Sequence, residues 1–279
     1  MTYRSLLVHV DDAERCSHRL DVASRMARDF GAVLVGAYLV QTRELVPSIS
    51  AMLPDSIVRQ RLQETGDAQA RAEASFRAAA AAAGLTTIEW RAPAGNPIEA
   101  AVAHARGVDL VVIGQPDPDD PDTAFAADLA NAVILSTGRP TLVIPYVGAA
   151  GATGETVLVA WDGSRESVRA IADALPLLAR AAKVVVMSIT AGGEARPSDV
   201  QARVQIVAYL SQHGIIATAR HLELPDVAMG ELLLSEAADV GADLIVMGAY
   251  GHARLQELVL GGVTRTMLEA MTVPVLMSH

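Results

Sequence analysis

Several features that would define a class of function are scarce in this 279-residue chain. It has one cysteine, Cys16, which excludes an intrachain disulfide and makes a reducing cytoplasm the simplest compartment. Its formal net charge is −10 and its pI is near 5.1. This acidic balance argues against a nucleic-acid partner, because phosphate neutralisation needs clustered Lys and Arg.

Membrane, targeting and metal signals are missing as well. Apolar stretches are interrupted by Asp, Gly or Pro within about ten residues, which is too short for a membrane span. The N-terminal apolar segment is too short for a signal peptide and lacks a small-residue cleavage site. The seven histidines are scattered, with no His-x-x-x-His pair or Cys/His cluster, so we expect no metal site.

The two halves of the chain repeat one plan. Ser5–Asp11 aligns without gaps on Thr156–Asp162, and Gly107–Gly114 aligns on Gly241–Gly248. Internal similarity at this spacing indicates a tandem duplication. With half of its residues apolar, a chain of this length can bury one large core or two ordinary ones.

We therefore expect two domains, at residues 1–147 and 155–279. The intervening residues are small and uncharged, which is typical of a linker. The last strand of each domain, Thr141–Ile144 and Val273–Met277, would otherwise be an exposed edge. We expect these strands to pair and make an intrachain pseudo-dimer, with a homodimer of whole chains as a further assembly.

Strands alternate with helices in each copy, which is typical of a parallel sheet covered on both faces. The fold class is therefore α/β, with two tandem doubly wound parallel-sheet domains. The strands predicted in the first copy are Ser5–Val10, Val33–Leu39, Thr86–Trp90, Leu110–Ile113 and Thr141–Ile144.

Two helix ends can also be predicted. A long second helix should end at Ala83, because Gly84 follows an alanine run and can adopt the left-handed cap. In the second copy, Ser198–Gln201 has the pattern of a capping box that opens a helix ending before Gly214.

A glycine loop in the second copy carries the main functional signal. The apolar run Leu244–Met247 indicates a buried strand, and Gly248, Gly251 and Gly261 then precede a segment with helical spacing. Glycine lets the backbone approach a phosphate chain closely, and a helix N-terminus supplies free N–H groups. The loop is neither a Gly-Lys-Ser/Thr phosphate loop nor a Gly-x-Gly-x-x-Gly fingerprint.

The spacing Gly-x2-Gly-x9-Gly, followed by Val263-Thr264 and closed by Val273–Leu276, resembles the universal stress protein family. The resemblance covers both halves and is strongest in the second. It implies the universal stress protein fold, which is adenine-nucleotide alpha-hydrolase-like, in a tandem arrangement. In that family the loop wraps the phosphates and ribose of ATP.

The resemblance also implies a set of ligand-contacting residues. Asp162 matches the position whose carboxylate accepts a hydrogen bond from adenine, although a helix-capping role, which Ser164 could share, is the alternative. Arg254 could reach a phosphate or be a solvated charge beside Glu257. The implied site residues are Ala160, Asp162, Ile189, Met247, Gly248, Gly251, Arg254, Gly261, Gly262, Val263 and Thr264. The apolar ones would be buried in any such sheet.

Gly262 departs from the family pattern. Most family members that bind ATP carry Ser or Thr there, and its hydroxyl meets a phosphate. Losing one charge-assisted hydrogen bond costs about 1.5–3 kcal/mol, or roughly ten- to a hundredfold in affinity. Binding is therefore weakened but not excluded.

The first copy departs further. Where the second copy has Gly251, Gly261 and Gly262, the first copy has Asp117, Ala127 and Asp128. Prolines between these positions also remove amide donors. Two carboxylates would repel a triphosphate. We expect at most one nucleotide per chain, in the second domain, although Asp11 is retained at the position of Asp162.

The expected function is stress-linked binding of ATP or a related adenine nucleotide, with or without Mg2+, that alters a surface seen by unknown protein partners. The alternative is a scaffold that has lost nucleotide binding. A Ser-His-Asp set could be assembled from Ser164, His252 and Asp162, but nothing in their spacing requires it. We therefore expect no enzymatic activity beyond slow ATP hydrolysis.

Overall fold

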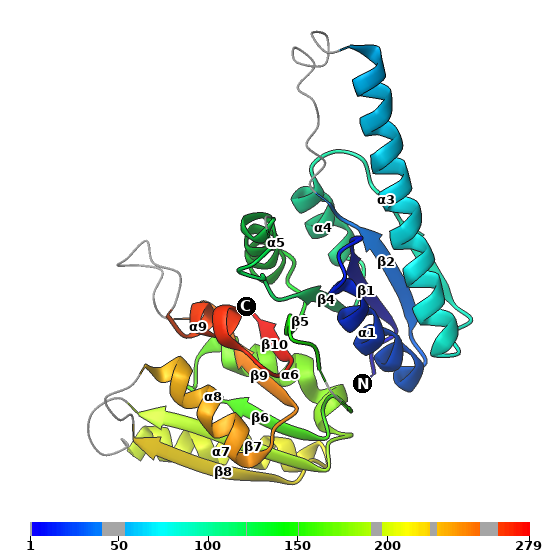
Figure 1. Ribbon diagram of the computed structural model, residues 1–279. Helices are drawn as coiled ribbons and strands as arrows, with labels where there is room; N and C mark the ends of the chain where they lie inside the picture. Colours follow the sequence, from blue (N-terminus) through cyan, green and yellow to red (C-terminus); the bar gives the residue numbers. More distant parts are fainter. Residues whose placement is uncertain are drawn as a thin grey trace.

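The computed structural model describes residues 2–40, 54–120, 122–149, 151–190, 197–223, 228–251 and 262–279 (Figure 1). The strands are β1 (Ser5–Val10), β2 (Val33–Tyr38), β3 (Ile88–Arg91), β4 (Leu110–Gly114), β5 (Thr141–Ile144), β6 (Thr156–Ala160), β7 (Lys183–Thr190), β8 (Ala217–Glu223), β9 (Leu244–Gly248) and β10 (Val275–Ser278). The helices are α1 (Cys16–Phe30), α3 (Asp55–Ala82), α4 (Pro97–Ala105), α5 (Thr123–Ser136), α6 (Arg165–Leu178), α7 (Pro197–Gln212), α8 (Met229–Val240) and α9 (Gly262–Ala270).

The strands form one ten-stranded sheet in the order β3-β2-β1-β4-β5-β10-β9-β6-β7-β8. Each half contributes five parallel strands in the same relative order, as expected for a duplicated α/β chain. The halves meet where β5 and β10 pair antiparallel, with Val143 opposite Val275 and Leu142 opposite Leu276. The expected pairing through the last strands is therefore confirmed.

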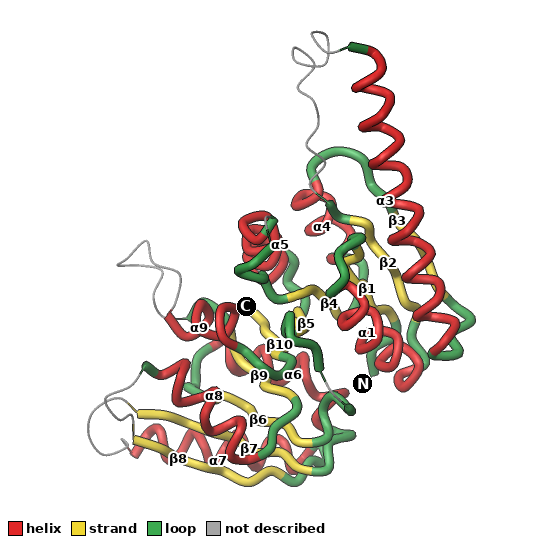
Figure 2. Tube along the Cα trace, in the orientation of Figure 1, coloured by secondary structure: helices red, strands yellow, loops and turns green. Residues whose placement is uncertain are grey.

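The helices cover both faces of the sheet (Figure 2). Because side chains alternate along a strand, Leu6 and Val8 of β1 pack on the side of α1, α3, α6 and α7. Leu7 packs on the opposite side, with α4, α5, α8 and α9. Each of these two hydrophobic clusters contains residues from both halves, so the core continues across the β5–β10 seam.

Both predicted helix ends are confirmed within one or two residues. Helix α3 ends at Ala82, and Gly84 adopts φ +76° while the amides of Gly84 and Leu85 bond to carbonyls of the last turn. Helix α7 ends before Gly214, which has φ +77°. The side chains of Ser198 and Asp199, on which the capping-box prediction depends, lie outside the described residues.

The strand predictions need small corrections. Strand β3 begins at Ile88 rather than Thr86, because its ladder with β2 extends only from Ile88 to Arg91. Strand β10 begins at Val275 rather than Val273, because Pro274 has no N–H to donate to a ladder. No helix in the described ranges is long and apolar enough to cross a membrane.

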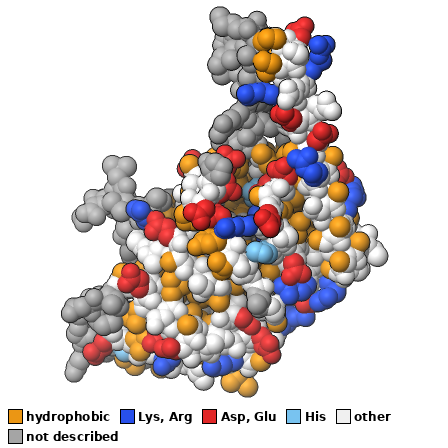
Figure 3. Space-filling view, viewed as in Figure 1, with side chains coloured by type: hydrophobic (Ala, Val, Ile, Leu, Met, Phe, Trp, Pro, Cys, Tyr) orange, Lys and Arg blue, Asp and Glu red, His pale blue; other side chains and the backbone are white. Residues whose placement is uncertain are grey.

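The face of the molecule drawn in Figure 3 carries charged side chains of both signs.

Candidate functional site

A cavity of about 480 Å³ lies at the carboxyl ends of β6, β7 and β9, beside α8 and the start of α9. The carboxyl edge of the strands is where ligands bind in open α/β sheets. Of the predicted site residues, those lining the cavity are Ala160, Asp162, Ile189, Met247, Gly248, Gly251, Gly262, Val263 and Thr264. The other two, Arg254 and Gly261, lie outside the described residues.

The turn after β6 gives Asp162 a structural role. Asp162 is exposed, and its Oδ1 accepts hydrogen bonds from the N–H (2.9 Å) and hydroxyl (2.6 Å) of Ser164. Ser164 in turn caps α6, because its Oγ accepts from the N–H of Ser167 at 3.1 Å. Ser164 is therefore the cap and Asp162 supports the turn, while its carboxylate also borders the cavity. The third member of the conceivable triad, His252, lies outside the described residues.

The inner wall of the cavity is apolar. Met187 and Ile189 are two residues apart on β7 and therefore share a face, while Met229 and Leu233 are four apart on α8. A flat aromatic ring could pack among such flexible side chains. The lining residues that the sequence analysis did not predict are Trp161, Ser167, Met187, Met229, Leu233 and Tyr250. The strand period around Ile189 and the helical spacing after Met229 are the signals that could have indicated three of them.

The structure requires glycine at position 248 of this loop but not at position 251. A β-carbon on Gly248 would lie 2.6 Å from the backbone of Glu166 and Ser167, so close packing of β9 against α6 requires glycine. A β-carbon on Gly251 would lie 3.4 Å from Glu166 Oε2, which is an ordinary contact, and its φ is outside the left-handed region. Gly251 is therefore not required by its backbone conformation.

Tyr250, rather than a glycine, adopts the left-handed conformation in this loop, with φ +58°. A bulky residue there costs about 1–3 kcal/mol and persists only when its surroundings hold it. Its N–H donates to Thr264 Oγ1 at 3.2 Å, and its hydroxyl donates to Asn131 Oδ1 in α5 of the first half. Its ring lies 6.5 Å from that of His279. Tyr250 is therefore held by residues of α9, α5 and the C-terminus.

The polar end of the cavity faces the N-terminus of α9. Gly262, Val263 and Thr264 line the cavity, and a β-carbon on Gly262 would meet nothing within 4 Å. Helix N-termini favour anions through free N–H groups and the helix dipole. Among the described lining residues there is no Lys or Arg, and the mostly buried carboxylate of Glu166 lies near Gly251. In the described part of the chain, helical amides are therefore the main attraction for a phosphate.

The aligned place in the first half is closed by side chains. Its cavity has a volume of only about 60 Å³. His9 stands where the second half has Ala160, and Arg19 stands where it has Ala170. Arg19 forms an ion pair with Asp11, and its Nε donates to the carbonyl of His9 at 2.6 Å. These three buried or half-buried groups fill the space that remains open in the second half.

The protonation of this cluster follows from its burial. Burial and the neighbouring Arg19 cation lower the pKa of His9 to about 4, so its neutral Nε2 donates to Leu39 O at 2.8 Å. Burial opposes ionisation of Asp11, but Arg19 outweighs it and lowers the pKa of that carboxyl. Asp117 forms an ion pair with Arg15. Filled volume therefore closes this site, whereas the carboxylate repulsion expected from sequence is offset in part by Arg15 and Arg19.

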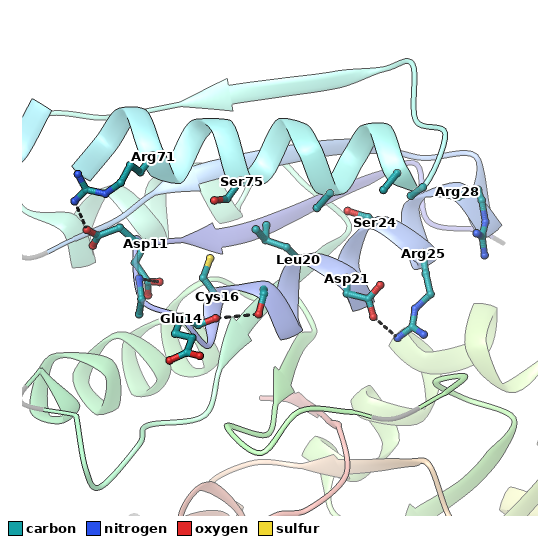
Figure 4. Close-up of a pocket in the computed structure, with 16 residues that line it drawn as sticks. Asp11, Glu14, Cys16, Leu20, Asp21, Ser24, Arg25, Arg28, Arg71 and Ser75 are labelled. Carbon is teal, nitrogen blue, oxygen red and sulfur yellow. Dashed lines mark hydrogen bonds and ion pairs between the residues drawn. The ribbon is translucent and has the colours of Figure 1, made fainter. Parts of the chain in front are cut away.

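A larger cavity of about 540 Å³ lies between α1 and α3 (Figure 4). Four of its charged residues form two ion pairs: Arg71 with Asp12 at 3.0 Å, and Arg25 with Asp21 at 3.1 Å. Cys16 and Ser17, at the N-terminus of α1, also line it, but its described lining contains no glycine, unlike that of the second-half cavity. Among the residues described, no group of three His, Cys, Asp or Glu side chains could hold a metal ion.

Comparison with known proteins gives one family. The universal stress protein family matches residues 2–145 and 154–279. A universal stress protein from Archaeoglobus fulgidus is 14% identical, with 98% of this chain and 97% of that chain covered and a TM-score of 0.74. A putative universal stress protein from Pseudomonas aeruginosa is 17% identical, with 99% and 93% covered and a TM-score of 0.58. A shorter universal stress protein, solved in complex with cAMP, is 22% identical over 52% of this chain, with a TM-score of 0.33. No curated protein matches.

Proposed function

Because the chain belongs to the universal stress protein family, in two tandem copies, we propose that it binds an adenine nucleotide in its second half and acts as a nucleotide-linked regulatory module. The observation that carries this proposal is the cavity of about 480 Å³ at the carboxyl ends of β6, β7 and β9. It gathers nine of the eleven residues implied by the family pattern, and its volume is in the usual range of small-molecule sites.

The chemistry of the cavity is graded from apolar to polar. Met187, Ile189 and Met247 offer an apolar slot for adenine, and Asp162 is an acceptor at its edge. The start of α9 offers backbone N–H groups to the phosphates. The apolar slot and the carboxylate thus suit the base, and the helix N-terminus suits the phosphates.

The acidic charge around the cavity would weaken the binding of a highly charged nucleotide. Asp162 and Glu166 are acidic, Gly262 has no hydroxyl, and the described lining has no cationic side chain. We propose that ATP binds as its Mg2+ complex, because the ion offsets part of the charge repulsion. We assign the module no enzymatic role beyond slow hydrolysis, since Ser164, the serine of the conceivable triad, already bonds to Asp162 and caps α6.

A scaffold without nucleotide is the second candidate. Its support is the first half, where His9 and Arg19 fill the aligned site. In this copy, packed side chains occupy the place where the other copy has a cavity. Such a protein would act through its surface alone.

Mass spectrometry of the purified, undenatured protein separates the two candidates by showing whether an adenine nucleotide co-purifies. Calorimetry with ATP and Mg2+, ADP, AMP and cAMP then ranks the ligands; cAMP is included because one family member was solved with it. Co-purification or saturable binding supports the module. Absence of both supports the scaffold.

The site itself is tested with Gly251→Val. Because the φ of Gly251 is outside the left-handed region, valine can adopt this backbone, and its methyl groups would enter the space beside Glu166 that the phosphates need. We expect binding to be lost while the circular dichroism spectrum stays unchanged. Asp117→Asn, at the aligned position of the first half, is the matched control and should bind normally. Undiminished binding by a folded Gly251→Val protein would place the site elsewhere.

A further inference from the structure

One aromatic side chain connects the candidate site to the other half of the chain. Tyr250 lines the cavity of the second half and also a separate cavity of about 440 Å³ at the junction of the two halves. The junction cavity is bordered by Ala127 and Asn131 of α5 and by Leu268 of α9. Tyr250 therefore lies between the candidate ligand cavity and the interface of the two halves.

The contacts of Tyr250 cross that interface. Its hydroxyl donates to Asn131 in α5, 119 residues earlier in the chain, while its own N–H is held by Thr264 Oγ1 at the start of α9. The neighbouring carbonyl, that of Ala249, lies 3.0 Å from Nδ1 of His279. Tyr250 is thus held at φ +58° in the short segment between Gly248 and Gly251, which both line the cavity.

Helix α9 is tied to the first half at its other end too. Gln115 is buried, and its Nε2 donates to the carbonyl of Leu268 at 3.0 Å. Its Oε1 accepts from the N–H of Tyr146, which fixes the amide orientation. Both Tyr250 and helix α9 therefore have an anchor in the first half.

We propose that Tyr250 is a positioning residue for the nucleotide site, and that the first half, through Asn131, holds the segment Gly248–Gly251 in its ligand-accepting conformation. This inference rests on the proposed function and adds a role for the half whose own site is closed. The first half contributes to binding by anchoring the loop rather than by holding a nucleotide. Nucleotide affinity in the second half therefore depends on an interdomain hydrogen bond.

Four variants of the full chain test the proposal. Tyr250→Phe removes the hydroxyl and keeps the ring, and Asn131→Leu removes the acceptor at similar size. Asn131→Asp keeps an acceptor and should restore the anchor. Arg180→Gln is the matched control, because it removes a different hydrogen bond between the halves, from Arg180 Nη1 to Asp29 O at 2.6 Å, far from the loop.

Two measurements are made on each variant. Calorimetry with ATP and Mg2+ gives the affinity. Hydrogen exchange of the Tyr250 amide in ligand-free protein reports how firmly that residue is held. We expect Tyr250→Phe and Asn131→Leu to bind about two- to tenfold more weakly and to exchange faster by a similar factor. We expect Asn131→Asp and Arg180→Gln to stay within about twofold of wild type.

The outcomes separate this inference from the proposed function. Wild-type affinity and exchange in Tyr250→Phe and Asn131→Leu would overturn the positioning role and leave nucleotide binding standing. Equal weakening in Arg180→Gln would also overturn it, because a general loosening of the halves would then be the cause. If wild type binds no adenine nucleotide, the proposed function fails, and the exchange rates alone support or overturn the anchoring of the loop.

Discussion

Replacing Arg19 with alanine should destabilise the N-terminal half and so test how its site is closed. Alanine is the residue that the second half carries at the aligned position, Ala170. The Arg19 side chain is only 7% exposed; its guanidinium pairs with Asp11 and donates from Nε to the carbonyl of His9. Removing it leaves the Asp11 carboxylate without its main counter-charge.

The size of the loss follows from burial. Removing one partner of a buried ion pair costs about 3–5 kcal/mol, because the other charge stays buried and unpaired. The Asp11 side chain is 22% exposed, so water can compensate in part. Shortening the apolar stem of Arg19 adds a small packing loss. We therefore expect the free energy of unfolding to fall by about 2–4 kcal/mol.

Urea denaturation at pH 7, followed by circular dichroism, measures this loss. Arg71→Ala is the matched control: its ion pair with Asp12 is exposed, at 64% and 38%, and should contribute less than about 1 kcal/mol. Asp11→Ala in the Arg19→Ala background should recover part of the stability, because it removes the unpaired carboxylate.

Two results would refute this reasoning. One is a loss for Arg19→Ala no larger than that of Arg71→Ala, which would mean that the pair is effectively solvated. The other is a further loss when Asp11→Ala is added, since the carboxylate would then be stabilised by something other than Arg19. ATP should still not bind the first half in any of these variants, because His9 remains in the space.

Three further predictions concern pH, nucleotide affinity and stoichiometry. The pKa of His9 is about 4 when folded and about 6.5 when unfolded, so the unfolded state binds more protons between these values. Stability should stay level above about pH 7 and fall by about 2 kcal/mol between pH 7 and pH 5, and His9→Gln should abolish that fall in urea denaturation. Gly262→Ser has room for its side chain and should tighten ATP binding about tenfold in calorimetry; unchanged affinity would exclude a phosphate contact there. Saturation should occur at one nucleotide per chain, and a titration that ends at two would contradict closure of the first site.

Local and repeated signals were readable in the sequence. Apolar runs such as Leu244–Met247 predicted strands, because a strand buried on both faces must be continuously apolar. The duplication predicted the like order of strands in the two halves, and the unpartnered last strands predicted the β5–β10 seam. The family resemblance that the glycine spacing carries implied most of the residues of one cavity, and they meet because the carboxyl ends of parallel strands share an edge of the sheet.

Three features were decided only by the tertiary structure. Arg19 reads in sequence as one more charge on an amphipathic helix, and only the approach of α1 to β1 turns it toward Asp11. Tyr250 takes the left-handed conformation that a sequence reading assigns to glycine, because Thr264 and Asn131, distant along the chain, hold it there. Met229 reaches the cavity because α8 packs against β6 and α9. Each depends on where elements far apart in sequence come to lie, which periodicity and composition do not encode.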